Sequence, residues 1–164
     1  MSPAIMSRVL TMLLRLEKGL EELGVTVLRN KKTTLEKDGA SISVVGVDDP
    51  TFAFDTDEML ESLTSEEDLF TLLLSHRPEL FDVYAENGID LTLSGHAHGG
   101  QFRLPFVGGI IAPNQGIFPK YDAGLYTAGD TNMVVSRGIG NSIFPFRFNN
   151  RPEVVLIELE KEEK

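Results

Sequence analysis

The sequence of 164 residues contains no cysteine, and this absence excludes disulfide bonds, thiolate metal ligands and thiol catalysis. Long hydrophobic runs are missing as well. Apolar runs such as residues 72–74 and 108–113 are far shorter than the roughly 18 residues of a membrane span. Charged residues interrupt the N-terminal leucines, and no site for signal-peptide cleavage follows them. We therefore expect neither a transmembrane segment nor a signal peptide.

Basic residues are scarce. The chain has 15 Lys and Arg against 25 Asp and Glu, which gives a net charge of −10. No Lys or Arg lies between Lys37 and Arg77, whereas ten acidic residues do. Such a balance repels phosphate backbones and anionic membranes, so general nucleic-acid binding is not expected. The acidic interval is either a solvated helix with its loops or an edge that repels anions or binds hard cations.

The length and the 41% of hydrophobic residues are those of one globular domain, residues 1–164. Ser2-Pro3 is typical of a helix start, and a helix is predicted from there to Gly24. Its apolar residues recur at spacings of three and four: Val9, Leu13, Leu16, Leu20 and Leu23. Further apolar residues surround the first half of this helix. We hypothesise that self-association through the N-terminal helix covers that surface.

Apolar alternation and turn residues predict the remaining elements. The predicted strands are residues 25–28, 33–36, 41–47, 69–75, 89–93, 125–127, 132–136 and 153–159, with helices at 56–63 and 78–86. The strands 69–75 and 89–93 flank a helix, and such a βαβ unit predicts parallel strands whose carboxyl ends share one sheet edge. The fold class is therefore α/β with mixed strand directions.

All three histidines follow these two strands. His76 comes after the first, and His96 and His98 come after the second. Open α/β sheets bind ligands at this edge. If the backbone is extended there, the rings of His96 and His98 project on the same side, with their Cα atoms about 6 to 7 Å apart. Any one histidine could be an ordinary surface residue, but three at one edge favour a metal site for Zn, Mn, Fe or Ni. Asp130 is interpreted as a turn residue.

Two motifs contain these histidines: Leu-Ser-His-Arg-Pro at 74–78 and Ser-Gly-His-Ala-His-Gly-Gly-Gln at 94–101. Together with Gly-Val-Asp-Asp at 46–49 and the stretches 136–140, 147–149 and 151–153, they resemble the C-terminal half of the calcineurin-like metallophosphoesterases. The branch that the chain looks most like includes bacterial membrane-associated and lipid-pyrophosphatase enzymes. The resemblance extends from about residue 16 to residue 159.

The resemblance implies part of an αββα sandwich, in which two mixed sheets pack face to face with helices outside. It also implies a hydrolase with two divalent metal ions, Mn, Fe or Zn, about 3.5 to 4 Å apart. A metal-bound hydroxide would attack a phosphomonoester, phosphodiester or pyrophosphate. By resemblance, His76 and His96 would bind one metal and His98 the other. Arg137 or Asn141 could support these ligands, and Arg137 could equally pair with the acidic interval. No residue of the chain is assigned a catalytic role.

Three other motifs of that family, Asp-x-His, Gly-Asp-x-x-Asp and Gly-Asn-His, are absent from this sequence. In the family they lie N-terminal to the matched region. We therefore expect the C-terminal portion of a metallophosphoesterase domain, weakly active or inactive alone, whether it is an expressed fragment, a truncated product or a remnant with another use. The sequence does not decide whether this chain is an enzyme by itself.

The alternative is a noncatalytic three-histidine module that binds one metal ion or oligomerises. On either hypothesis we expect a cytoplasmic protein or one peripheral to the membrane.

Overall fold

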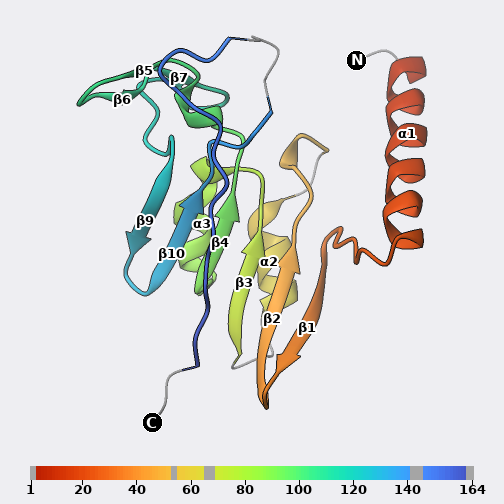
Figure 1. Ribbon diagram of the computed structural model, residues 1–164. Helices are drawn as coiled ribbons and strands as arrows, with labels where there is room; N and C mark the ends of the chain where they lie inside the picture. Colours follow the sequence, from red (N-terminus) through yellow and green to blue (C-terminus); the bar gives the residue numbers. More distant parts are fainter. Residues whose placement is uncertain (1–2, 53–54, 65–68, 141–145, 162–164) are drawn as a thin grey trace.

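The computed structural model describes residues 3–52, 55–64, 69–140 and 146–161 (Figure 1). The helices are α1 (Pro3–Glu22), α2 (Thr56–Thr64) and α3 (Phe81–Glu86), with short 3-10 turns η1 (Pro50–Phe52), η2 (Pro78–Leu80) and η3 (His98–Gly100). The strands are β1 (Lys31–Lys37), β2 (Ala40–Gly46), β3 (Phe70–Leu74), β4 (Leu91–Ser94), β5 (Arg103–Leu104), β6 (Gly108–Gly109), β7 (Ile111–Ala112), β8 (Gly116–Ile117), β9 (Gly124–Ala128) and β10 (Thr131–Val135).

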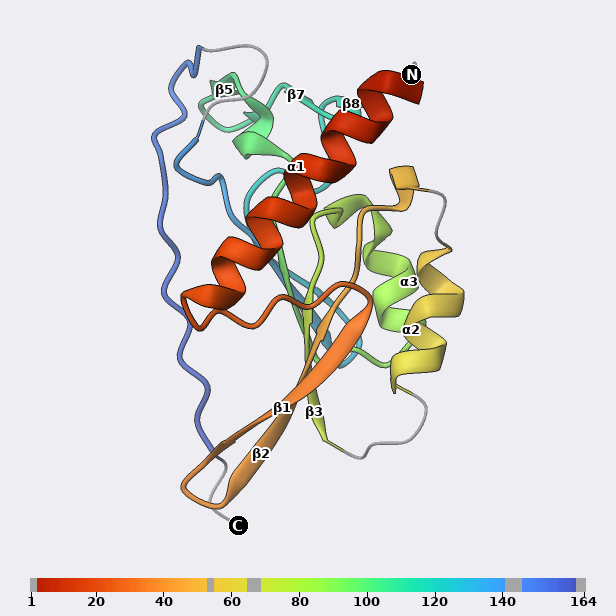
Figure 2. The same cartoon turned by 90° about the vertical axis from the view of Figure 1, so that its right-hand side faces the viewer.

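Six strands form one sheet in the order β1-β2-β3-β4-β10-β9. The four central strands are parallel, and β1 and β9 add antiparallel edges. Helices α2 and α3 cover one face of this sheet (Figures 1 and 2). The mixed α/β class and the βαβ unit β3-α3-β4 are therefore confirmed. The remaining strands of the described residues pair only as two-stranded ribbons, β5 with β6 and β7 with β8. This part of the chain thus forms one sheet layer.

The core lies between the sheet and the helices α2 and α3. Alternate strand residues turn to this side, and Val45, Leu73 and Met133 are fully buried there. Leu60 of α2 and Tyr84 of α3 are fully buried against them. Strand residues of the other parity face the opposite side and are less well covered, since side chains alternate between the two faces of a sheet.

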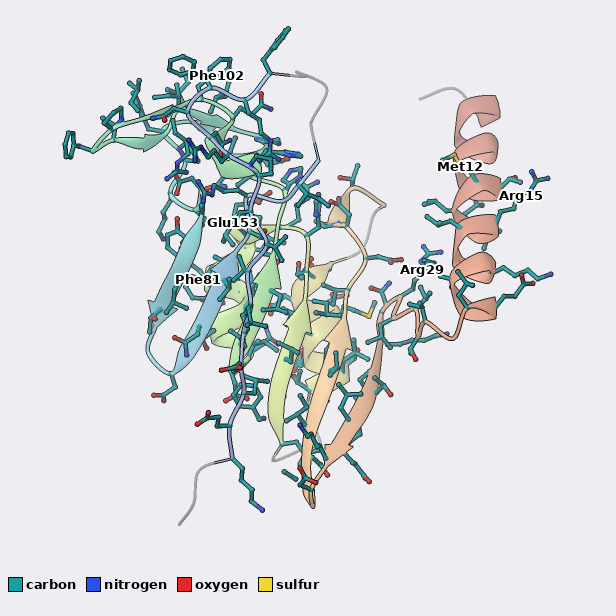
Figure 3. All side chains as sticks on the ribbon, viewed as in Figure 1. Met12, Arg15, Arg29, Phe81, Phe102 and Glu153 are labelled. Atoms are coloured by element: carbon teal, nitrogen blue, oxygen red, sulfur yellow. The ribbon has the colours of Figure 1, made fainter. Side chains whose placement is uncertain are left out.

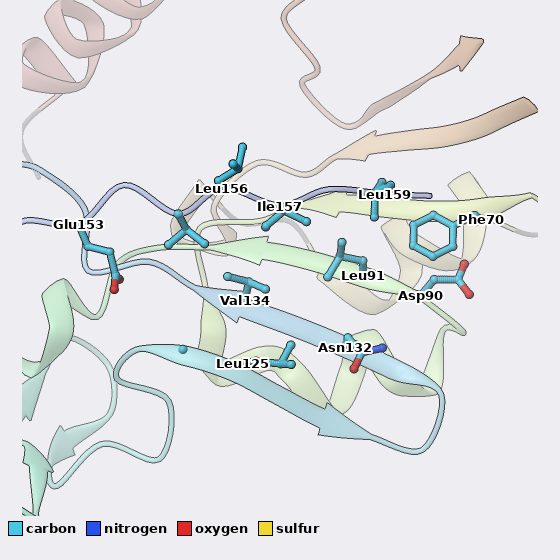
Figure 4. Close-up of a pocket in the computed structure, with 12 residues that line it drawn as sticks. Phe70, Asp90, Leu91, Leu125, Asn132, Val134, Glu153, Leu156, Ile157 and Leu159 are labelled. Atoms are coloured by element: carbon cyan, nitrogen blue, oxygen red, sulfur yellow. The ribbon is translucent and has the colours of Figure 1, made fainter. Parts of the chain in front are cut away.

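Residues 153–159 were expected to form a strand, and this prediction is wrong. The segment is extended but has no ladder partner, and it runs along the face of the sheet opposite α2 and α3. It borders a groove of about 570 Å³ whose floor includes Phe70, Leu91 and Val134 (Figure 4). Its alternating apolar side chains suit a flat apolar surface as well as a sheet edge, so the pattern predicted an extended chain but not pairing.

The expected strand at residues 25–28 is also not formed, because β1 already pairs with the free edge of β2. These residues connect α1 to the sheet instead. A Cβ on Gly46 of β2 would lie only 2.5 Å from the Leu28 carbonyl oxygen, so the connection passes directly over the end of β2.

Helix α1 begins at Pro3, as predicted, and stands apart from the helices on the sheet (Figures 1 and 2). Met12 and Arg15 lie about one turn apart on this helix (Figure 3). Leu10, Met12 and Leu14 are 50%, 73% and 52% exposed, so the described residues leave this apolar surface largely uncovered. Within the described ranges, no helix combines the length and apolarity needed to cross a membrane.

Candidate metal centre

The carboxyl ends of the four parallel strands meet at one edge of the sheet, at the top of Figure 1. The loop after β2 carries Asp49, the loop after β3 carries His76, the loop after β4 carries His96, and the loop after β10 carries Arg137. Parallel pairing of consecutive strands is what brings these loops together. This is the edge at which open α/β sheets place their ligands.

His76 and His96 contact each other at this edge. Nε2 of His76 lies 3.1 Å from Nδ1 of His96, and the ring centroids are 4.7 Å apart at an interplanar angle of 60°. Two nitrogens bound to one divalent ion at about 2.0–2.1 Å would lie about 2.8–3.4 Å apart for bond angles between about 90° and 109°. The spacing of these two nitrogens therefore fits a shared metal ion.

The second ring nitrogen of His96 has a partner that the sequence did not suggest. Nε2 of His96 lies 2.8 Å from Oδ1 of Asn114, a residue with φ of +59° between the short strands β7 and β8. Asparagine tolerates this left-handed geometry. Nothing in the glycine-rich loop sequence marked Asn114, because only the folded loop brings it to His96.

The turn that carries His98 is not extended, so the geometry assumed for His96 and His98 is wrong. His96 and His98 both have left-handed backbones, with φ of +63° and +48°, and Ala97 between them is helical. The side chain of Asn150 donates a hydrogen bond to the His98 carbonyl oxygen at 2.6 Å, which anchors this turn. Within the part of the chain that the structure describes, no three His, Asp or Glu side chains are grouped so as to hold a metal ion.

The glycines of the second motif allow the backbone to pack closely. A Cβ on Gly99 would lie 2.7 Å from Cγ of Arg137. A Cβ on Gly100 would lie 2.9 Å from the carbonyl carbon of Gly109. Both glycines also have positive φ, +64° and +72°, which disfavours any other residue there. These positions therefore build the turn around His98.

The surroundings of His76 and His98 favour the neutral form of each ring. Partial desolvation lowers the pKa of His76, and repulsion from His96, Arg77 and His98 lowers it further, against an opposing contribution from Asp49. Desolvation, followed by Arg147 and His96, lowers the pKa of His98. Neutral imidazole is the form that binds a metal, so both directions favour metal binding near neutral pH.

Other predicted residues have structural roles. Arg137 pairs with Glu153 at 2.8 Å rather than with the acidic interval, because the C-terminal segment passes beside it. Asn141 lies outside the described residues. Asp130 lies in the turn between β9 and β10, as predicted. From the acidic interval, Asp48 and Asp49 form ion pairs with Arg29 and Arg77.

The fold and this edge define a mixed α/β protein with a histidine pair suited to a divalent metal. The chain is 39% identical over 137 residues to the uncharacterized metallophosphoesterase YkuE of Bacillus subtilis. This alignment covers 83% of the chain and 47% of YkuE. The chain is also 36% identical over 140 residues to the phosphodiesterase YaeI of Escherichia coli. That alignment covers 85% of the chain and 49% of YaeI. These similarities support an assignment of the chain to the metallophosphoesterase family.

The chain spans about half the length of the curated relatives that it matches. Comparisons with protein-family models and with solved structures found no match.

Proposed function

We propose that this chain carries the C-terminal half of a binuclear, metal-dependent phosphoesterase site. The observation that carries the proposal is the 3.1 Å approach of His76 Nε2 and His96 Nδ1 at the carboxyl edge of parallel strands. The similarity to metallophosphoesterases over most of the chain supports the same assignment. His76 and His96 would hold one metal ion, and His98 would contribute to the second.

The metal ions, when bound, would supply Lewis-acid polarisation of a phosphoryl oxygen and activation of a water molecule. The chain's own residues orient the ligands. Asn114 holds the second nitrogen of His96, and Asn150 holds the backbone of His98. These contacts restrict the motion of the His96 ring and of the His98 backbone before a metal ion binds, and this reduces the entropy lost on binding. The remaining ligands and any general acid would come from a segment equivalent to the other half of the relatives.

The substrate class is a phosphate ester or pyrophosphate. The name of YaeI, a phosphodiesterase, supports a phosphodiester as the first substrate to test. The net charge of −10 disfavours a long polyanion, because neither a large basic face nor counterion release would help it bind. We expect the chain alone to hydrolyse phosphodiesters at no more than a trace rate, since three of the family's ligand motifs are missing from it.

Metal stoichiometry tests the proposal. Zn²⁺ and Mn²⁺ should bind to the full chain, and His76→Ala and His96→Ala should each remove the same ion, whereas His98→Ala should leave that ion bound. One ion lost equally in all three variants would instead support the noncatalytic three-histidine module. No binding by the wild-type chain, measured by calorimetry and elemental analysis, would refute a preformed half-site.

Hydrolysis of bis(p-nitrophenyl) phosphate with Mn²⁺ tests the expected inactivity. Rapid turnover that a His96→Ala, His98→Ala double variant abolishes would show that this chain is sufficient for catalysis. Turnover that the double variant retains would indicate a contaminant.

We further propose that the exposed apolar surface of α1 is covered by a second copy of the chain. Leu10, Leu14 and Leu16 are 50%, 52% and 56% exposed in the described structure, and apolar surface of this kind favours association. This proposal is independent of the metal site.

A further inference from the structure

The loop that carries His76 is held by the buried guanidinium group of Arg77, which is not a metal ligand. Arg77 follows His76 directly and is only 8% exposed. Its Nε and Nη2 donate to the two carboxylate oxygens of Asp49 at 2.6 and 2.8 Å. Nη2 also donates to Thr51 Oγ1 at 2.6 Å, and Nη1 donates to Glu79 at 3.0 Å. The side chain is therefore fixed by three different residues.

A second contact holds the backbone of the same loop. The hydroxyl of Tyr84 donates to the Arg77 carbonyl oxygen at 2.6 Å, and it lies 2.6 Å from Oγ of Ser75. Tyr84 is fully buried in the core beneath the loop. Ser75 and Arg77 are both buried, while His76 between them is exposed. The chain on each side of His76 is thus tied to the interior.

These contacts connect two strands at the site. Asp49 follows β2 and Arg77 follows β3, so their ion pair sets the position of one loop relative to the other. The Arg77 guanidinium keeps the pKa of the Asp49 carboxyl far below its usual range, and the carboxylate therefore stays charged at neutral pH. A buried ion pair adds little net stability over apolar residues of similar volume, whereas removing one partner costs much. Its main effect here is geometric.

We infer that Arg77, paired with Asp49, is a positioning residue that holds His76 Nε2 within coordinating distance of His96 Nδ1. The metal-binding part of this inference rests on the proposed function. Mutation of an outer-shell residue that orients a metal ligand typically lowers metal affinity by about 10- to 100-fold.

The neighbouring carboxylate provides a matched control. Asp48 accepts from Nε of Arg29 at 3.2 Å and from Nη2 at 2.8 Å, the same two guanidinium nitrogens that Arg77 uses toward Asp49. Arg29 belongs to the connection between α1 and β1 (Figure 3), and it contacts neither histidine loop through a hydrogen bond or ion pair in the described residues. Arg→Lys at either position keeps the charge and removes the planar fork.

The experiment compares Arg77→Lys and Arg29→Lys in the full chain with two measurements. Calorimetric titration with Zn²⁺ alone measures metal affinity. Nuclear Overhauser contacts between the imidazole protons of His76 and His96 in the metal-free protein measure their approach. We expect Arg77→Lys to weaken Zn²⁺ binding at least about tenfold and to lose the ring contacts, while Arg29→Lys keeps both.

Equal effects in the two variants, or retained ring contacts and affinity in Arg77→Lys, would overturn the inference. If Arg77→Lys does not fold, Asp49→Asn preserves the shape of the acceptor, removes its charge and is judged by the same two results. If the wild-type chain binds no Zn²⁺, the proposed function fails, and the ring contacts still decide whether Arg77 positions His76.

Discussion

Replacement of Gly100 by alanine tests the close packing of the turn that carries His98. The Cβ of alanine would meet backbone, with the Gly109 carbonyl carbon at 2.9 Å and the Ile110 nitrogen at 3.1 Å. Real Cβ atoms avoid such distances, and backbone cannot move aside as a flexible side chain can. Gly100 also has φ of +72°, so alanine there is strained even without a neighbour.

These two effects add to a sizeable loss of stability. A non-glycine residue in the left-handed region costs about 1–2 kcal/mol, and overpacking a tight contact costs about 1–3 kcal/mol. We therefore expect Gly100→Ala to lower the free energy of unfolding by about 2–5 kcal/mol. At roughly 2–4 °C per kcal/mol for a chain of this size, the melting temperature should fall by about 4–20 °C.

Gly88→Ala is the control that separates the two effects. Gly88 closes α3 with φ of +67°, and a Cβ there would meet nothing within 4 Å. Its cost should therefore be the conformational part alone, about 1–2 kcal/mol. Urea unfolding of both variants gives the difference directly. If Gly100→Ala loses no more stability than Gly88→Ala, the contact between the two backbones is not as tight as described, and the reasoning fails.

Three further predictions concern the core, the histidines and the first helix. Leu60→Ala in the fully buried site on α2 should cost about 2–5 kcal/mol in urea unfolding, and a loss below about 1 kcal/mol would contradict the core described above. The fold lowers the pKa values of His76 and His98, so the unfolded chain binds more protons than the folded chain as the pH falls through about 6.5. The free energy of unfolding should therefore decrease from about pH 7 to about pH 5. A His76→Gln, His98→Gln double variant should flatten that decrease. Sedimentation at micromolar concentration should detect dimers for the wild type and monomers for a Leu14→Glu, Leu16→Glu variant, whereas a monodisperse wild-type monomer would refute self-association through α1.

Local sequence patterns predicted most of the fold correctly. Helix α1, strand β2, helix α2 and the unit β3-α3-β4 form close to their expected bounds, because apolar periodicity and terminal residues act over only a few neighbours. The errors fall on segments 25–28 and 153–159, which join no strand ladder. Pairing depends on which sheet edge is free, and no pattern within one segment contains that information.

The candidate site divides in the same way. The motif spacing and the parallel strands predicted that His76, His96 and His98 share one edge. The structure places the nearest ring nitrogens of His76 and His96 3.1 Å apart, but its described residues hold no three His, Asp or Glu side chains grouped for a metal ion. The contact of His96 with Asn114, the anchoring of His98 by Asn150 and the pairing of Arg77 with Asp49 join residues 18, 52 and 28 positions apart. Their residue types are common in loops, so only the folded chain distinguishes them from other polar residues.

The sequence by itself determined the order of elements, the parallel unit and the presence of histidines at its carboxyl edge, since each depends on short-range periodicity and turn chemistry. Tertiary structure decided which loops meet, which ring nitrogens face each other and which buried charges hold them in place. Those contacts arise when distant segments compete for the same space and the same hydrogen-bond partners, and this competition exists only in the folded chain.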